Sequence, residues 1–322
     1  MTSHTVELPA LDGREPLGFL AALGLLQILT SECRLPARLA FSDTTGCAQL
    51  TSPLQDTSSI AETVTGIIKN IPGGAVLPGA GPGFPPPSAS GKDPLRQERP
   101  NFRTMVGQAR ARDPRTAALW LPALVTDLAL DNTGRCAITP LNAPSGQQKL
   151  RTFFEKPLQE VQRNPAYLHQ ALTRWHRVEG CTGEYLDHRV LRSNADDVRG
   201  RPGRETGVPG ATWLAIMALP LLRLTGSNGH RAATLWHRTG NRRLMLWPLW
   251  ETPLDTSAVQ ALLSHPALKP ADDKPTVSTR HWQPLGIFNV YGAERQRITG
   301  RTFEGVLAPI PVTKTSPAPH GQ

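Results

Sequence analysis

A strongly hydrophobic, uncharged stretch covers residues 16–29 of the chain. Its apolar residues lie all round a helical wheel rather than along one stripe, a pattern typical of a helix buried on every side. Pro16 is tolerated in the first turn of a helix, and Glu15 suits the positive end of the helix dipole. We therefore predict a central core helix here.

The same stretch indicates neither a membrane protein nor a secreted one. A membrane span needs about 20 apolar residues, and this run is shorter. Glu7, Asp12 and Glu15 precede the run, where a signal peptide would carry basic residues. The expectation is a cytoplasmic protein without membrane contact.

Strand-like and helical patterns alternate after this helix. Residues 37–42 and 47–51 alternate between apolar and polar positions, which predicts a β-hairpin. Residues 72–100 are rich in proline and glycine, which excludes a helix or a central strand and predicts a long surface loop. Further predicted elements are a helix over 60–69 capped by Ser58 or Ser59, a helix over 116–130 interrupted by Pro122, a strand over 135–139 and a helix over 165–177.

A similar order of elements recurs in the second half of the chain. Residues 210–222 predict another uncharged helix, which Pro220 should bend or end early. Two predicted strands, 232–238 and 243–250, and a short helix over 256–264 follow. Because buried helix, hairpin and short helix also occur in this order over residues 16–69, a diverged duplication is one hypothesis.

These elements predict an α+β fold in which buried apolar helices lie beside antiparallel β-hairpins. A last strand pair is expected over residues 286–297 and 303–312. We divide the chain into an N-terminal half (1–140), a basic C-terminal half (141–312) and a disordered tail (313–322).

Charge is unevenly distributed along the chain. The net charge is +9, and 28 of the 35 basic residues are arginine. Residues 1–95 hold 5 basic and 8 acidic residues, whereas the remainder holds 30 and 18. A concentration of arginine suits bidentate contacts with phosphates, so the composition favours a nucleic-acid partner. A GC-rich genome, which favours arginine codons, is the alternative explanation.

Motifs of the common enzyme classes are absent from the sequence. It has no GxxxxGK[ST] phosphate loop, no HExxH zinc motif and no GxSxG nucleophile elbow, and its four cysteines show no CxxC spacing. We therefore expect free thiols, no cofactor and no metal. The catalytic candidates with the closest spacing are His176, Cys181, Glu184, Asp187 and His188. These residue types suit a metal site or a Cys–His nucleophile, whereas the arginines beside Asp187 favour salt bridges.

The segment 144–154 carries the clearest binding signal. It begins with small residues that can present free N–H groups at a helix start, and such groups attract anions. Two glutamine amides suit base edges, and two cations suit phosphates. The residues that we expect to contact nucleic acid are Ser145, Gln147, Gln148, Lys149 and Arg151, with Arg189, Arg192, Arg242 and Arg243 extending the basic path. An ordinary capped helix with a polar face is the alternative.

The tryptophans add one candidate contact. Trp236, Trp247 and Trp250 lie on strand patterns, so we expect them in the core. Trp175 lies on a predicted helix between Arg174 and His176, and a ring flanked by cations suits stacking on a base.

Three short segments also occur in an order found in one protein family. They are the helix of residues 16–26, Ser-Gly-Gln-Gln at 145–148, and Tyr185-Leu186-Asp187-His188-Arg189 ahead of a second buried helix at 209–220. Together they resemble the large-subunit-like (Cascade) proteins of type I-G CRISPR systems, in their smaller variant. The matches are spread over residues 16–224.

This resemblance implies a non-catalytic subunit of a crRNA-guided effector complex in antiviral defence. It implies crRNA, target DNA or both, together with other effector subunits, as the partners. In such complexes base pairing reads most of the sequence, and the protein contacts the crRNA handle or a few bases beside the target. Two other interpretations stay open: a metal-dependent nuclease or hydrolase using His176, Asp187 and His188, and a module that binds only proteins.

Overall fold

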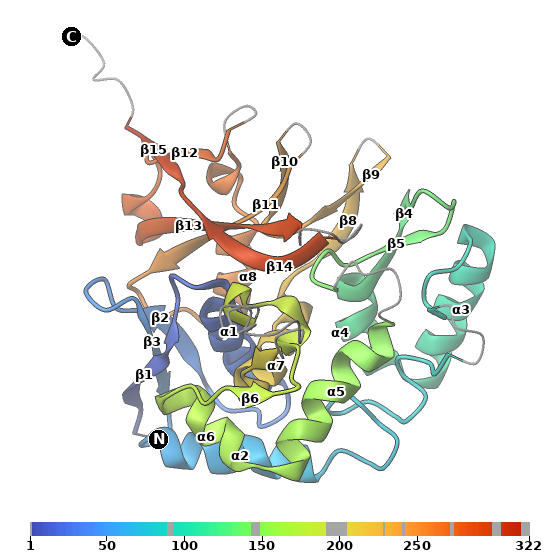
Figure 1. The fold of residues 1–322 in the computed structure, drawn as a ribbon, viewed down its shortest axis with the longest axis horizontal. Helices are drawn as coiled ribbons and strands as arrows, with labels where there is room; N and C mark the ends of the chain where they lie inside the picture. Colours follow the sequence, from blue (N-terminus) through green and yellow to red (C-terminus); the bar gives the residue numbers. More distant parts are fainter. Residues whose placement is uncertain are drawn as a thin grey trace, which may run out of the picture.

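A computed structural model describes residues 2–88, 93–142, 149–190, 205–227, 229–239, 242–270, 274–297 and 304–316. Within these residues, eight α-helices and fifteen strands form the predicted α+β fold. A six-stranded sheet lies over two central helices, α1 (Pro16–Ser31) and α7 (Pro209–Ile216) (Figure 1). Three further helices cover the other side of this pair: α2 (Thr57–Lys69), α5 (Leu150–Arg163) and α6 (Ala166–Thr173).

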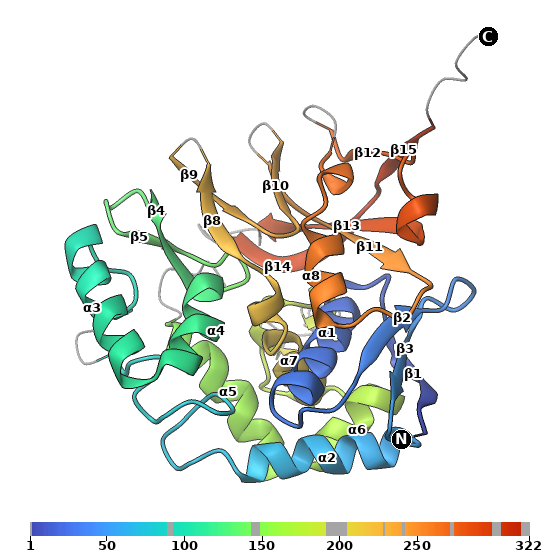
Figure 2. The same ribbon diagram turned by 180° about the vertical axis from the view of Figure 1, so that it is seen from behind.

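The two central helices pack directly against each other. α1 is buried at every position from Pro16 to Leu29, which confirms the predicted core helix. A Cβ atom added at Gly24 would lie 1.7 Å from the carbonyl oxygen of Leu214, so only glycine permits this approach of α1 to α7. Seen from behind, α8 (Thr256–Leu263) lies over α1 (Figure 2).

α7 is shorter than the helix predicted over residues 210–222. It ends at Ile216, and a 3-10 helix, η3 (Leu219–Leu221), follows. Proline lacks the N–H that an α-helical hydrogen bond needs, so Pro220 excludes a longer helix, as expected. α6 is likewise shorter than the helix predicted over residues 165–177.

The six-stranded antiparallel sheet has the strand order β14-β13-β11-β10-β9-β8. Its strands are β8 (Leu224–Ser227), β9 (His230–Ala233), β10 (Trp236–Thr239), β11 (Arg242–Trp250), β13 (Ile287–Arg297) and β14 (Glu304–Ile310). The single strand predicted over residues 232–238 is wrong. The chain turns at Leu235, which has a φ of 69°, and β9 and β10 lie on either side of this turn.

A second, three-stranded sheet pairs β1 (His4–Asp12), β3 (Cys47–Ser52) and β2 (Arg38–Phe41) in that order. The β2–β3 hairpin confirms the predicted one, whereas β1 was not predicted. α2 begins earlier than the helix predicted over residues 60–69. Its N-cap is Asp56 rather than Ser58 or Ser59, because the Asp56 carboxylate accepts the backbone N–H of Ser59 at 2.7 Å.

The helix predicted over residues 116–130 is wrong in its second half. α4 (Pro114–Leu124) is followed by β4 (Val125–Leu130), which pairs with β5 (Cys136–Ile138). The β-branched Val125 and Thr126 favour a strand at this point. Before α4, the helix α3 (Arg99–Arg112) was not predicted, because its sequence is polar and only Phe102 of it is buried.

Two predictions about irregular segments need correction. The proline-rich stretch is not simply a surface loop, since Val76 and Leu77 are buried in the core. The tail predicted to be disordered from residue 313 begins with a strand, β15 (Thr313–Thr315), which pairs in parallel with β12 (Thr276–Ser278). Residues 317–322 lie outside the described part of the chain.

One contiguous cluster of buried side chains extends from Leu8 to Leu307 and includes Trp247, Trp250, Phe153 and Phe154. Trp247 and Trp250 are therefore in the core, as predicted. The four cysteines are free thiols, also as predicted. No described helix has the length and hydropathy that crossing a bilayer requires.

Candidate nucleic-acid interface

The structure places the predicted contact residues in different environments. Ser145, Gln147, Gln148 and Arg192 lie outside the described residues. Lys149 is the N-cap residue of α5 and is half-buried. The first N–H of this helix, that of Leu150, donates to the carboxylate of Asp93 at 2.6 Å. A carboxylate of the chain itself therefore accepts the first N–H of this helix, whereas residues 145 and 146, whose N–H groups were expected to bind an anion, lie outside the described residues.

The Arg151 side chain contacts the backbone of the chain itself and does not extend the predicted basic path. Its guanidinium donates to the carbonyl oxygens of Pro82 at 3.0 Å and Pro85 at 2.9 Å, and also to that of Gly74. All three acceptors belong to the proline-rich stretch, so this side chain holds that stretch against α5.

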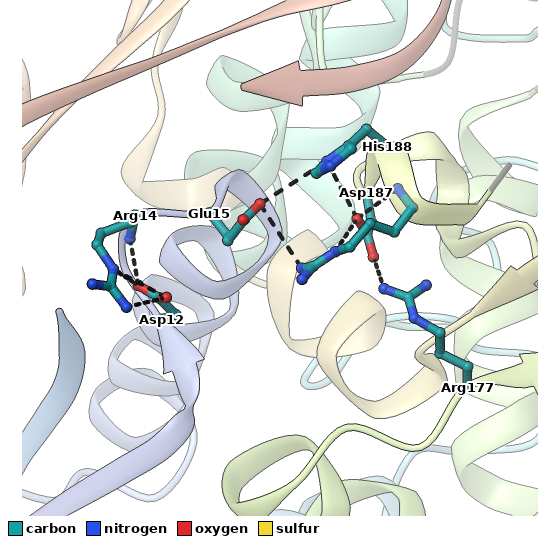
Figure 3. A network of polar contacts seen from close by, with 7 residues as sticks. Asp12, Arg14, Glu15, Arg177, Asp187 and His188 are labelled. Carbon is teal, nitrogen blue, oxygen red and sulfur yellow. Dashed lines mark hydrogen bonds and ion pairs between the residues drawn. The ribbon is translucent and has the colours of Figure 1, made fainter. Parts of the chain in front are cut away.

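Arg189 belongs to an ion-pair network around the buried carboxylate of Asp187. Figure 3 shows this carboxylate with Arg177, His188 and Glu15. The carboxylate of Asp187 is 2% exposed and accepts hydrogen bonds from Arg177, from the Arg189 side chain at 3.1 Å and from the Arg189 backbone N–H at 2.9 Å. Glu15, at the start of α1, lies 3.8 Å from the Arg189 guanidinium and 4.0 Å from His188. The network thus ties the 185–189 stretch to the first core helix.

The charges of this network balance one another. Burial acts to raise the pKa of Asp187, but the hydrogen bond and charge of Arg177 and the neighbouring Arg189 outweigh it and hold this pKa below its usual value. The Arg189 guanidinium also lies 5.3 Å from the centre of the Trp175 ring. The ring predicted to stack on a base is therefore covered by a cation of the same chain.

The catalytic candidates between residues 176 and 188 do not gather into one site. His176 is exposed, whereas Asp187 is buried between two arginines. Among the described residues, no three His, Cys, Asp or Glu side chains come together as a metal ion would require.

Glu184 contrasts with Asp187, although only two residues separate them. It is 1% exposed and borders a cavity of about 140 Å³ between η1 (Gly183–Tyr185) and α5. One carboxyl oxygen accepts from the Thr182 hydroxyl at 3.3 Å, and the other has no hydrogen-bond partner among the described residues. Burial raises the pKa of Glu184 to about 7.

A larger cavity, of about 430 Å³, lies where the β4–β5 hairpin meets the six-stranded sheet. We call it the arginine cavity, after Arg96, Arg231, Arg238 and Arg243 in its lining. The other lining residues are Leu130, Asp131, Asn132, Thr133, Ala137, Ile138, Thr139, Pro140, Asn142, His230, Ala233, Trp236 and His237.

The register of the sheet explains why three of the arginines share one face. Arg238 of β10 lies directly opposite Arg243 of β11, and Trp236 lies opposite Ala233 of β9. Side chains alternate along a strand, so Arg231, Trp236, Arg238 and Arg243 all face the same way. On β11 this is also the face of Trp247, whose ring centre lies 5.6 Å from that of Phe19 in α1.

The arginine cavity is positively charged. Asp131 is the one carboxylate among its described lining residues, and it accepts a hydrogen bond from Arg96 at 3.2 Å. Burial acts to raise the pKa of Asp131, but hydrogen bonds from Thr133 and Arg96 outweigh it and hold the pKa well below its usual value. Four guanidinium groups therefore share the described part of the cavity with a single carboxylate.

The two arginines of the β10–β11 hairpin that were predicted as contacts point to opposite faces of the sheet. Arg243 lines the arginine cavity. Arg242 faces the other way and pairs with Glu294 of β13 at 2.8 Å. Of the predicted contact residues that the structure describes, only Arg243 thus lies in this cavity.

Arg295 holds together the backbone segments that adjoin the cavity. It is 9% exposed and donates to the carbonyl oxygens of Tyr185 at 2.8 Å, Leu141 at 2.8 Å and Gly305 at 3.1 Å. One side chain therefore holds both the stretch that ends in Asn142, on the cavity wall, and the stretch that carries Asp187.

Arg96, Arg231 and Arg238 were not predicted as site residues, and Trp236, which was expected in the core, is instead half-buried and lines the cavity. A signal for two of the arginines was present, because a hairpin between strands ending at 238 and beginning at 243 sets Arg238 and Arg243 opposite each other. Nothing comparable predicts the contact of Arg96 with Asp131. The sequence matches no model of a known protein family and no curated protein.

Proposed function

We propose that this chain is a non-catalytic, cytoplasmic nucleic-acid-binding subunit of a crRNA-guided type I CRISPR effector complex. The observation that carries the nucleic-acid part is the arginine cavity, with four arginines, one carboxylate and an aromatic ring among its described lining residues. Guanidinium groups bind phosphates bidentately, and aromatic rings stack on bases. The assignment to a CRISPR complex comes from the resemblance of the three sequence segments.

The charge and position of the cavity favour nucleic acid over a protein partner. Arg238 and Arg243 are exposed at its mouth, so they can reach a polyanion without unfolding any element. They lie at directly opposite positions of neighbouring strands, so one phosphate can contact both guanidinium groups.

The experiment measures binding of a fluorescent oligonucleotide of about 12 nucleotides by anisotropy, between about 50 and 200 mM salt. The double substitution Arg238→Ala/Arg243→Ala is expected to lower the affinity and to reduce the salt slope by about 0.7 to 0.9 for each phosphate that the variant no longer neutralises. Arg242→Ala is the control, because it removes an arginine from the same hairpin but on the opposite face of the sheet.

Two results would contradict the proposal. The first is an equal loss of affinity in the control and in the double variant, since this would show a general charge effect. The second is no binding of any oligonucleotide by the full-length protein at the lower salt concentration. Complex membership is tested separately, by co-expression with crRNA and the neighbouring effector subunits and by analysis of what co-purifies with the chain.

A further inference from the structure

We infer that the arginine cavity takes up one unpaired nucleotide of a single strand, with its phosphate at Arg238 and Arg243 and its base against Trp236. This inference rests on the proposed function, and it specifies the substrate class as single-stranded rather than duplex nucleic acid.

The groups that would bind a nucleotide lie at two depths in the cavity. Arg238 and Arg243 are exposed, whereas Arg231 and Trp236 are half-buried and line the interior. A duplex keeps its bases stacked and shows only their edges within the grooves, so it can place phosphates on the exposed pair but cannot place a base beside Trp236. Only an unpaired nucleotide reaches both levels of the cavity.

The Trp236 ring is the contact expected for the base. It is half-buried and lines the cavity, so part of the ring is accessible from the cavity. Its Nε1–H is shielded from solvent, so a base in the cavity contacts the ring and not this donor. Aromatic rings stack on bases whatever the sequence, so Trp236 offers a base a stacking surface.

The interior cation is already held in place. One nitrogen of Arg231 donates to the carbonyl oxygen of Ile138 on β5 at 3.1 Å. A guanidinium carries its five N–H donors in a rigid planar fork, so a contact at one nitrogen also fixes the direction of the others. Binding then requires less ordering of the side chain.

The test compares a single strand of about 12 nucleotides without self-pairing with the duplex of the same sequence, as RNA and as DNA, on the full-length protein. The single strand is expected to bind at least about 10-fold more tightly than the duplex. Trp236→Ala should lower affinity for the single strand by about 10-fold or more and leave duplex affinity unchanged. Trp236→Leu, which keeps apolar volume but no aromatic ring, should lower it by about the same factor.

The outcomes separate this inference from the proposed function. Equal affinity for both forms, together with the expected loss in Arg238→Ala/Arg243→Ala, overturns the single-strand inference and leaves the function standing. An unchanged single-strand affinity in Trp236→Ala also overturns it. If Trp236→Ala fails to fold, by circular dichroism, Trp236→Leu decides the question, since it keeps most of the apolar volume and an unchanged single-strand affinity in it overturns the inference. Absence of binding to either form overturns both.

Discussion

Arginine has two different roles in two regions of this molecule. In the Asp187 network, carboxylates of the chain balance the arginines, and the central carboxylate is 2% exposed. In the described part of the arginine cavity, four arginines share one carboxylate, and two of them are exposed at the mouth. The net charge of +9 therefore does not measure the binding surface, because some of the basic residues stabilise the fold.

The two regions should respond differently to substitution. Removing one partner of a buried ion pair leaves an uncompensated charge in the interior, and this is strongly destabilising. Removing an exposed arginine has little effect on stability but reduces the attraction of a polyanion.

The largest effect is expected from Asp187→Ala. It leaves Arg177 and Arg189 without their buried counterion, so the free energy of unfolding should fall by about 3–5 kcal/mol, measured by chemical denaturation. Asp12→Ala is the control, because Asp12 pairs with an Arg14 side chain that is 48% exposed, and such pairs contribute at most about 1 kcal/mol. Equal losses in the two variants would remove the basis for calling the Asp187 network a structural core.

The next effect concerns Glu184, which is as deeply buried as Asp187. No hydrogen bond from an arginine reaches it within the described part of the chain, and burial raises its pKa from 4.5 to about 7. Because the folded protein holds this proton more tightly than the unfolded chain, the resulting stability is present below pH 4.5 and is lost as pH rises through 7. The free energy of unfolding should fall by up to about 3 kcal/mol over this range.

Glu184→Gln tests this prediction, since the amide carries no charge at any of these pH values. Denaturation at the two ends of the range should show a smaller decrease in stability than in the parent protein. Glu160→Gln, on an exposed ion pair beside the same small cavity, is the matched control and should keep the parent's pH dependence. If Glu184→Gln also keeps the parent's dependence, a different group titrates.

Sequence patterns predicted the elements that depend on local composition. The core helix α1 was predicted from its lack of charge, and the β2–β3 hairpin was predicted from alternation around a short polar turn. α3 was missed because it buries a single phenylalanine and has no apolar stripe. The burial of Leu77 in a proline-rich stretch depends on distant contacts, which no local pattern encodes.

The site was less predictable than the fold, because its residues meet only through tertiary structure. Arg96 reaches Asp131 although two helices and the strand β4 separate them in the sequence, and Arg231 reaches the backbone of Ile138 on another sheet. Basic residues on a helix start, such as Arg151, look equally suited to phosphate and to a nearby carbonyl. Sequence composition cannot distinguish these two uses, because both need the same guanidinium donors.

The smallest effect is expected from Arg151→Ala, which tests whether this side chain binds carbonyl oxygens of the chain or phosphate. Since its guanidinium donates to carbonyl oxygens of Gly74, Pro82 and Pro85, Arg151→Ala should lower the free energy of unfolding by about 1–2 kcal/mol. Its affinity for oligonucleotides should equal that of the parent, unlike that of Arg238→Ala/Arg243→Ala. Lys149→Ala, two residues earlier, is the control for stability, because it removes a cation that makes none of these contacts. A loss of affinity in Arg151→Ala without a loss of stability would return this residue to the binding path that its sequence context predicts.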